Sequence, residues 1–290
     1  MTQMIVIVGP TAAGKSARAM ALAPQLDGEI VSADSRHVYI GMDIGTNKPT
    51  PDEQHAVRHH LLDVRQPHEP FSLAEYVARA RAAIADIEAR GRTPLLVGGT
   101  GQYVRALVEG WQVPEAPPDE AFRARWLAVA QVHGPDALFA ELLARDPAAG
   151  ATIDKRNVRR VVRALEVIEA TGKRWSDLQR HEAPRTLIDW IYVNQPREAL
   201  FAVADARIAR MLEQGWLDES RALLGALGAR GITPDDALQL PALSALGYRE
   251  LAQVSLGRMT LDAAVEAIKR ETRRFIRMQD TWFRKLTASA

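Results

Sequence analysis

The segment from Gly9 to Ser16, Gly-Pro-Thr-Ala-Ala-Gly-Lys-Ser, constrains the fold of this chain more than any other. It has the spacing G-x-x-x-x-G-K-S and follows the apolar run Met4–Val8, which predicts a buried strand, a phosphate-binding loop and a helix from Lys15 onward. Glycines let the backbone curl so that its N–H groups point at one anion, and the helix adds its positive dipole end. A glycine-containing turn that binds nothing is the alternative. The pattern therefore predicts a phosphate ligand, without deciding whether that ligand is ATP.

Each part of the loop has an expected task. Lys15 supplies a point charge to a terminal phosphate, and the Ser16 hydroxyl is placed to ligate Mg²⁺. The remaining loop positions are expected to surround the phosphate with backbone, and they are Gly9, Thr11, Ala12, Ala13 and Gly14.

Composition narrows the class of protein. A chain of 290 residues can form one large domain or two small ones. Because there is no cysteine, disulfides and thiolate metal sites are excluded. No apolar run approaches the ~18 residues of a membrane-spanning helix, and the N-terminus reads as a strand rather than a secretory signal. We expect a cytoplasmic protein, and nothing in the sequence demands more than a monomer.

Strands and helices alternate in the first part of the chain. A strand over Glu29–Ser32 leads to Asp34, a helix spans Leu73–Arg90, and a strand over Pro94–Val97 runs into a glycine-rich segment that contains Thr100. This order predicts an α/β fold, with a parallel sheet covered by helices on both faces. Ligands of such sheets bind at the carboxyl ends of the strands. The phosphate loop, Asp34 and Thr100 should therefore meet at one edge.

A proline-rich stretch at 113–119 interrupts this alternation. Only helices are predicted after it, with stops at Gly134-Pro135, Asp146-Pro147 and Gly172, until a strand returns at 189–193. We therefore predict a catalytic core of residues 1–113 and 189–290, which ends in a long helix from about Leu261 to Lys285. Residues 114–188 form a predicted helical insertion.

Two predicted helices carry arginine stripes. In the insertion the arginines repeat at i, i+3, i+4 and i+7, opposite valines and a leucine, and they are Arg156, Arg159, Arg160 and Arg163. The final helix repeats the pattern with Arg270, Arg273, Arg274 and Arg277. Most charge runs are simply solvated helix faces. Here arginine predominates, few acids interleave and the net charge is only +1, so the stripes indicate a surface for a polyanion such as a nucleic acid.

The acid beside the loop indicates what the loop is for. A hydrolytic enzyme with this loop needs an Asp at the end of another strand, yet the strand at 94–97 ends without one. Asp34, after the second strand, can instead take a proton from an acceptor or hold Mg²⁺ through water, or it can merely cap the next turn. This arrangement favours group transfer to an acceptor over hydrolysis.

A resemblance covers nearly the whole chain. The segments that carry it, in family order, are GPTAAGKS, SADSRHVYIGMDIGTNKP, HHLLDV, FSLAEYV, PLLVGGTGQYVRAL, NVRRVVRALEV, LGYREL and TRRFIRMQDTWFRK. They resemble the tRNA dimethylallyltransferases, also called tRNA isopentenyltransferases or IPP transferases. The resemblance implies a P-loop core with a helical insertion that grips tRNA. It also implies Mg²⁺-assisted transfer of a dimethylallyl group from its diphosphate to N6 of adenosine 37, beside the anticodon.

The resemblance also implies roles for residues. Asp34 matches the general base, and Thr100 matches a position of the reaction channel, although it could instead cap the helix that follows. The loop with Lys15 and Ser16 would bind the diphosphate together with Arg207. Contacts with tRNA are implied for Ser35, Arg36, His37, Arg159, Arg160 and Arg163, whereas Arg277 and Gln279 could contact tRNA or pack.

The chain departs from the family pattern at three positions. Val203 stands where the first of two arginines is usual, so Arg207 alone remains for the diphosphate; Gln102 replaces a usual Leu, and His37 a usual Gln. Three other functions use the same loop: a small-molecule kinase, an adenylate isopentenyltransferase and a tRNA-binding protein without activity. The first two leave the arginine stripes unexplained, and the third leaves Lys15, Ser16 and Asp34 unexplained.

Overall fold

The computed structural model describes residues 3–114, 116, 118–178 and 187–288. The chain forms two compact units, one of residues 1–108 and 184–290 and the other of residues 109–183. These bounds lie five residues before the predicted borders after 113 and 188. Within the described ranges, no helix combines the length and the apolar character needed to cross a membrane.

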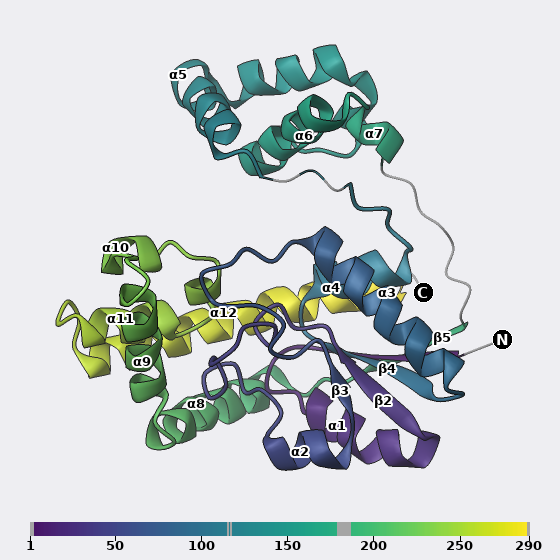
Figure 1. Cartoon of the computed structure of the whole chain (residues 1–290), viewed down its shortest axis with the longest axis vertical. Coiled ribbons are helices and arrows are strands. Elements are labelled where there is room, and N and C mark those ends of the chain that lie inside the picture. The colour runs from purple at the N-terminus through teal and green to yellow at the C-terminus, as the bar shows by residue number, and fades with distance from the viewer. Residues whose placement is uncertain (1–2, 115, 117, 179–186, 289–290) are drawn as a thin grey trace. The chain divides into compact units, whose positions relative to one another are not determined.

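A five-stranded parallel sheet lies at the centre of the larger unit (Figure 1). Its strands are β1 (Gln3–Val8), β2 (Gly28–Ser32), β3 (His59–His60), β4 (Thr93–Gly98) and β5 (Leu187–Tyr192), in the spatial order β3-β2-β4-β1-β5. Strands β1 and β4 are buried along nearly their whole length, which explains why they read as continuous apolar runs. The parallel sheet confirms the predicted α/β fold.

Helices cover both faces of this sheet. Figure 1 shows α1 (Lys15–Leu22) and α2 (Pro51–Ala56) on one side, and α3 (Leu73–Ala89) and α4 (Gly101–Val108) on the other. Helix α1 is followed directly by a 3₁₀ turn over Ala23–Leu26, where Pro24 occupies the first turn. The carboxyl ends of β1, β2 and β4 thus meet at the edge where α1 and α4 begin.

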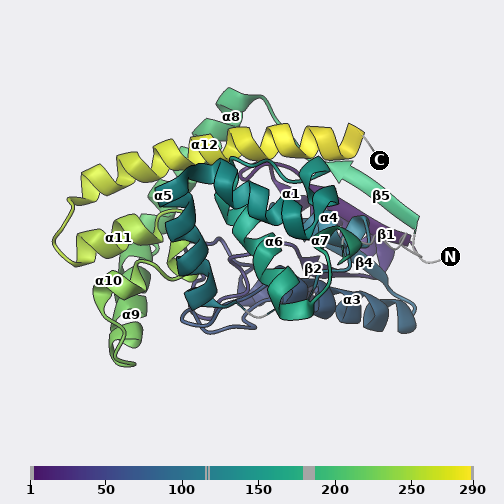
Figure 2. The same ribbon diagram turned by 90° about the horizontal axis from the view of Figure 1, so that it is seen from above.

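The C-terminal helices form a second core of the larger unit, built around the buried Trp216 and Tyr248. They are α8 (Arg197–Glu213), α9 (Trp216–Gly228), α10 (Pro234–Ala237), η3 (Ala242–Ser244), α11 (Tyr248–Ser255) and α12 (Leu261–Ala288). Helix α12 runs from beside α11 to the sheet, where it contacts α4 and β5 (Figure 2). It therefore brings residues from the end of the chain to the edge that carries the loop.

The smaller unit is helical, as the sequence predicts. It contains α5 (Glu120–Arg145), η2 (Pro147–Ala151), α6 (Val158–Thr171) and α7 (Trp175–Leu178). The predicted stop at Gly134 is a kink inside α5, where φ is 82° and ψ is 165°. Apolar residues of α5 and α6 form the core of this unit, among them Leu138, Leu142, Val161, Val162 and Leu165.

Candidate active site

The predicted phosphate loop connects β1 to α1. Gly9 has φ 148°, and a Cβ added there would lie 1.9 Å from the carbonyl oxygen of Val193. Gly14 has φ 97° and Ala12 has φ 69°, so the backbone turns through the left-handed region twice before the helix begins. The glycines at 9 and 14 are therefore required by the path of the backbone.

The start of α1 offers unpaired donors to an anion. In the described part of the chain, the amides of Gly14, Lys15 and Ser16 have no protein acceptor. The Lys15 Nζ donates to the carbonyl of Pro10 at 2.8 Å, which leaves it further N–H groups. Burial lowers the pKa of Lys15 to about 8; the charge of Asp34 raises this pKa, and that of Arg207 lowers it further. The ammonium group still carries its charge at pH 7.

Arg207 reaches the loop from α8. Its Nη1 donates to Thr11 Oγ1 at 3.4 Å, and burial is the main cause that lowers its pKa. Val203, one helical turn earlier, is 38% exposed and does not line this site. The positive charge around the phosphate loop therefore comes from Lys15, within the loop, and from Arg207 of α8.

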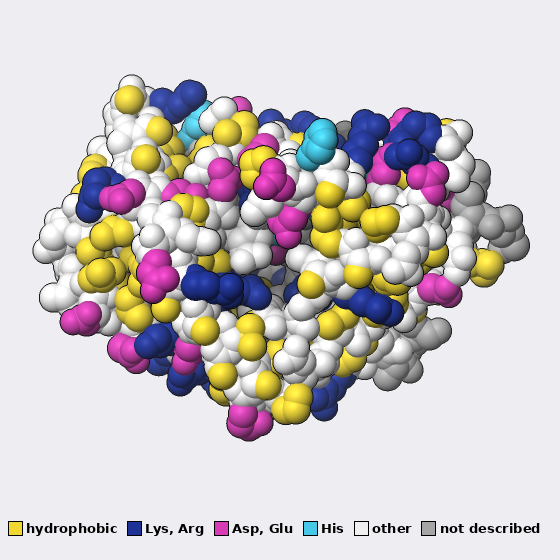
Figure 3. Space-filling view, turned by 90° about the horizontal axis from the view of Figure 1, so that it is seen from below, with side chains coloured by type: hydrophobic (Ala, Val, Ile, Leu, Met, Phe, Trp, Pro, Cys, Tyr) yellow, Lys and Arg dark blue, Asp and Glu magenta, His cyan; other side chains and the backbone are white. Residues whose placement is uncertain are grey.

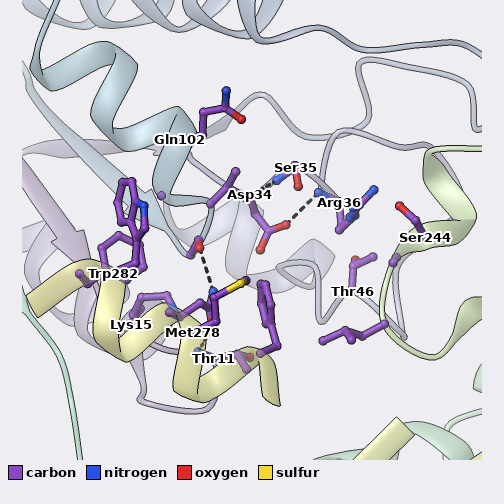
Figure 4. A pocket seen from close by; sticks show the side chains of 18 of the residues that line it. Thr11, Lys15, Asp34, Ser35, Arg36, Thr46, Gln102, Ser244, Met278 and Trp282 are labelled. Atoms are coloured by element: carbon purple, nitrogen blue, oxygen red, sulfur yellow. Dashed lines mark hydrogen bonds between the residues drawn. The ribbon is translucent and has the colours of Figure 1, made fainter. Parts of the chain in front are cut away.

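Two cavities meet beside the loop. The loop cavity, about 300 Å³, is lined by Gly14, Ser16, His37 and Arg207 among others. The aromatic cavity, about 480 Å³, is lined among others by Gln102, Phe275, Met278 and Trp282 (Figure 4). Four residues line both cavities: Thr11, Lys15, Asp34 and Thr46. Each cavity contains two cations, Lys15 with Arg207 in the loop cavity and Lys15 with Arg36 in the aromatic cavity, and only the aromatic cavity is lined by Phe and Trp side chains.

Asp34 lies at the junction of the cavities. Its Oδ1 accepts a hydrogen bond from the Arg36 amide at 2.8 Å, so the turn-capping alternative is correct for one oxygen. Its Oδ2 accepts no hydrogen bond from the residues that the structure describes. One carboxylate oxygen therefore holds the turn while the other is open to a ligand.

Thr100 supports Asp34 through its neighbour. The Thr100 Oγ1 accepts a hydrogen bond from the Ser35 amide at 3.0 Å. Both residues line the aromatic cavity, as does Arg36, whose Nη1 donates to the carbonyl of Pro241 at 2.6 Å. The structure thus brings 34–36 and Thr100 together.

His37 is engaged at both ring nitrogens. Because a carbonyl only accepts, Nε2 must donate to Thr46 O at 3.1 Å, and the Ser32 hydroxyl can then donate to Nδ1 at 3.2 Å. The ring therefore ties β2 to the loop that carries Thr46. Contact between His37 and tRNA stays a prediction.

The two α12 residues behave differently. Gln279 is 5% exposed; its Oε1 accepts from the Thr11 amide and its Nε2 donates to Gly99 O, each at 2.8 Å. The packing alternative is therefore correct for Gln279. Arg277 is exposed and lies over the ring of Phe201, 5.7 Å from its centroid.

The insertion stripe separates into free and paired arginines. Arg159 and Arg160 are exposed, with no side-chain partner among the residues that the structure describes. In contrast, Arg163 donates to Glu166 at 2.5 Å and to the Ala116 carbonyl at 3.0 Å, so it holds the unit together. Glu166 is buried, which the sequence alone does not reveal, and the contact of Arg163 with tRNA stays a prediction.

Acidic partners interleave on α12 as well. Arg273 pairs with Asp205 of α8, and Arg274 lies 3.7 Å from Glu271. The face seen in Figure 3 likewise intersperses acidic and basic side chains, with Lys and Arg beside a central hollow. One of these acids, Asp205, comes from a different helix, so the sequence of α12 alone does not reveal its pairing with Arg273.

Glu219 is a site-building residue that the sequence analysis missed. Its carboxylate accepts from the amides of Asp43, Ile44 and Gly45 at 2.8, 2.7 and 3.2 Å, and from the Tyr248 hydroxyl at 2.5 Å. It thereby fixes the loop that presents Thr46 to both cavities. No local signal marks Glu219, because its partners lie 29 residues away (Tyr248) and 174 to 176 residues away (the three amides).

The site suits a divalent cation that a ligand helps to hold. Among the described residues, no group of three or more His, Cys, Asp or Glu side chains could hold a metal by itself. Mg²⁺ is commonly bound by one or two protein oxygens together with substrate phosphates and water. Ser16 and Asp34 both line the loop cavity and supply such oxygens.

Fold and site together define a class of protein: a P-loop fold that binds a phosphorylated substrate next to an acceptor cavity containing a carboxylate. The family model of IPP transferase matches residues 37–286. The chain belongs to this family.

Its relatives carry consistent names. A tRNA dimethylallyltransferase of Chloroflexus aurantiacus is 49% identical over 286 residues, 99% of this chain and 94% of the relative. One of Roseiflexus sp. is 50% identical over 99% of this chain and 91% of the relative.

Solved structures agree. The tRNA isopentenylpyrophosphate transferase of Bacillus halodurans is 38% identical with a TM-score of 0.68, covering 98% of this chain and 87% of its own. A eukaryotic dimethylallyltransferase, described as acting on tRNA, is 27% identical with a TM-score of 0.81, covering 97% of this chain and 70% of its own.

Proposed function

We propose that this enzyme transfers a dimethylallyl group from dimethylallyl diphosphate to N6 of adenosine 37 of tRNA. The products are N6-isopentenyladenosine and diphosphate. The observation that carries the proposal is the position of Asp34, which faces a cationic cavity and an aromatic cavity at once. A carboxylate in that place can take a proton from an acceptor while an anion leaves on the other side.

The loop cavity would bind the diphosphate. Amides at the start of α1, the Lys15 ammonium and the Arg207 guanidinium all provide hydrogen-bond donors to an anion. Negative charge grows on the leaving oxygen as the allylic C–O bond breaks, so these groups stabilise the transition state more than the ground state. Mg²⁺, held by Ser16 together with the diphosphate and water, would add Lewis-acid stabilisation to the leaving group.

The aromatic cavity would receive adenine and the allylic chain. The N6 lone pair forms the new bond to C1, the C1–O bond breaks with its electrons on diphosphate, and the N6 proton passes to Asp34 Oδ2. An exocyclic amine is a weak nucleophile, so alignment against C1 contributes as much as basicity. Thr100 and Ser35 hold this edge in place and line the path of the base.

The tRNA would be bound by exposed cations of both units. Arg159 and Arg160 would contact the backbone of the anticodon stem-loop, as would Arg277, while Arg36 lies beside the base. The adenosine must leave its stack to reach Asp34. We further infer that the enzyme acts as a monomer in the cytoplasm.

A transfer assay tests this function. Labelled dimethylallyl diphosphate and Mg²⁺ are incubated with unmodified tRNA, with AMP, or with ATP and small acceptors. Label on tRNA alone supports the proposal. Label on AMP would make the protein an adenylate prenyltransferase, and phosphate transfer from ATP would make it a kinase.

A further inference from the structure

Gln279 joins two segments that are remote in sequence. Its Oε1 accepts from the Thr11 amide in the phosphate loop, and its Nε2 donates to the Gly99 carbonyl after β4. The partners lie 268 and 180 residues away, and the side chain is 5% exposed. Both polar ends of the amide are thus committed to backbone groups of the active site.

The glycine-rich segment is shaped to admit α12. A Cβ on Gly99 would lie 2.5 Å from Gln279 Nε2, and one on Gly101 would lie 2.4 Å from the ring of Trp282. Atoms do not approach so closely, so these two positions accept no larger residue while the side chains of Gln279 and Trp282 keep their places. The glycines between β4 and α4 therefore serve the approach of the C-terminal helix.

The residue after Gln279 anchors this part of the helix. Asp280 Oδ1 accepts from the Tyr192 hydroxyl at 2.5 Å and from Asn194 Nδ2 at 2.9 Å, at the end of β5. Helix α12 is thereby tied to the strand that neighbours β1 in the sheet. This anchor fixes the point from which Gln279 reaches the two loops.

We propose that Gln279 is a positioning residue that sets the phosphate loop against the segment carrying the general base. The path is continuous: Gln279 holds Thr11 and Gly99, Gly99 precedes Thr100, and the Thr100 hydroxyl holds the amide of Ser35 beside Asp34. The proposal rests on the proposed transfer reaction. Through this path, the Gln279 side chain on α12 aligns C1 of the bound dimethylallyl diphosphate with the N6 amine of adenosine.

Loss of this bridge should affect chemistry more than RNA binding. Without Gln279, the Thr11 amide and the Gly99 carbonyl each lose a hydrogen-bond partner. Each of the two segments can then move to find a new partner. A displacement of about 1 Å between reacting groups can lower a rate about 100-fold. The tRNA surface, which includes Arg159 and Arg160, is made by other residues and should not change.

Three variants separate these effects. Q279L has nearly the same shape and removes both hydrogen bonds; Q279E keeps an acceptor for Thr11 but loses the donor to Gly99 and adds negative charge beside the anion site. The matched control is T272V, because Thr272 is buried on the same helix and lines neither cavity. Single-turnover rate, binding of Mg²⁺-diphosphate and binding of tRNA are measured for each folded variant.

We expect Q279L to transfer about 10- to 100-fold more slowly per folded molecule, with tRNA affinity within about twofold of the wild type. Q279E should weaken diphosphate binding more than Q279L does, because like charges repel. T272V should match the wild type in all three measurements. If Q279L does not fold, Q279N and Q279E are held to the same criterion.

Two results would overturn the proposal. One is an unchanged single-turnover rate in a folded Gln279 variant. The other is a loss confined to tRNA affinity, which would make Gln279 an RNA contact. If the proposed transfer reaction is wrong, the wild type itself will be inactive. Binding of Mg²⁺-diphosphate by Q279L and Q279E will then still show whether the hydrogen bonds of Gln279 shape the phosphate loop.

Discussion

Asp34 divides its two oxygens between structure and chemistry. Oδ1 receives the Arg36 amide, which fixes the carboxylate on its turn, and Oδ2 faces the cavities. A general base must be held still and yet keep a free lone pair, and one Asp in such a turn meets both needs. The same division makes Asp34 a residue whose two roles can be tested separately.

Asp34→Asn should remove the base and keep the turn. The amide oxygen can still accept from Arg36, so the fold is expected to survive, whereas proton acceptance is lost. We expect transfer to fall about 10²- to 10⁴-fold with tRNA affinity unchanged, measured by single-turnover kinetics and filter binding. Transfer within threefold of the wild type would remove Asp34 from the base role.

Lys15 should make diphosphate binding sensitive to pH. Its pKa is lowered to about 8, so the ammonium form falls as pH rises through 8, and the free enzyme loses a positive charge that the anion needs. The dissociation constant for Mg²⁺-diphosphate should therefore rise, approaching tenfold per pH unit above 8.

Lys15→Arg supplies the control for this titration, since arginine keeps its charge throughout this range. The ratio of wild-type to variant dissociation constants cancels the titration of the ligand itself. This ratio should rise between pH 7.5 and 9.5 in calorimetric titrations. A flat ratio would show that Lys15 does not control the pH dependence.

At the scale of elements, one carboxylate, that of Glu219, fixes a loop from a distant part of the chain. The Glu219 carboxylate on α9 accepts hydrogen bonds from three consecutive amides of the loop 43–45 and from the Tyr248 hydroxyl of α11. Gly45 is needed beside it, because a Cβ there would lie 1.9 Å from Trp216 Nε1. Residues 43–45 of the GMDIGT motif therefore form a loop that packs against the C-terminal helices.

Glu219→Gln should destabilise the larger unit. The new NH₂ group faces backbone N–H donors, so at least one charge-assisted hydrogen bond is lost and a donor is left unpaired. We expect a loss of about 2–3 kcal/mol in the free energy of unfolding, measured by urea denaturation. The control, Asp218→Asn, alters an exposed neighbour that pairs with Arg221 and should cost under about 0.5 kcal/mol. Equal effects of the two variants would contradict this role.

At the scale of the whole molecule, the smaller unit supplies charges that its own packing does not use. Arg159 and Arg160 are exposed, whereas Arg163 donates hydrogen bonds to Glu166 and to the Ala116 carbonyl. Replacing Arg159 and Arg160 by Ala should weaken tRNA binding and reduce the slope of log affinity against log salt by about one to two. Arg163→Ala should instead lower stability. Equal effects of both changes on the salt slope would contradict the distinction.

Local patterns in the sequence sufficed for the phosphate loop, the parallel sheet, the helical insertion and the stops at Asp146 and Gly172. They did not suffice for contacts that only the tertiary fold creates. The partners of Glu219 and Gln279 lie on other elements, as does the Ala116 carbonyl that Arg163 binds, and neither periodicity nor spacing encodes burial of a particular carboxylate. The family resemblance implies tRNA contact for His37 and either tRNA contact or packing for Gln279, but it does not reveal the hydrogen bonds that both side chains make within the protein.

The most direct test of the account is the product on tRNA. Unmodified tRNA with adenosine at position 37 is incubated with the wild-type enzyme, dimethylallyl diphosphate and Mg²⁺, and its nucleosides are analysed by mass spectrometry; the same tRNA with guanosine 37 is the control. We predict N6-isopentenyladenosine only in the first tRNA, and almost none with Asp34→Asn. No prenylated nucleoside, or equal prenylation of both tRNAs, would contradict the account.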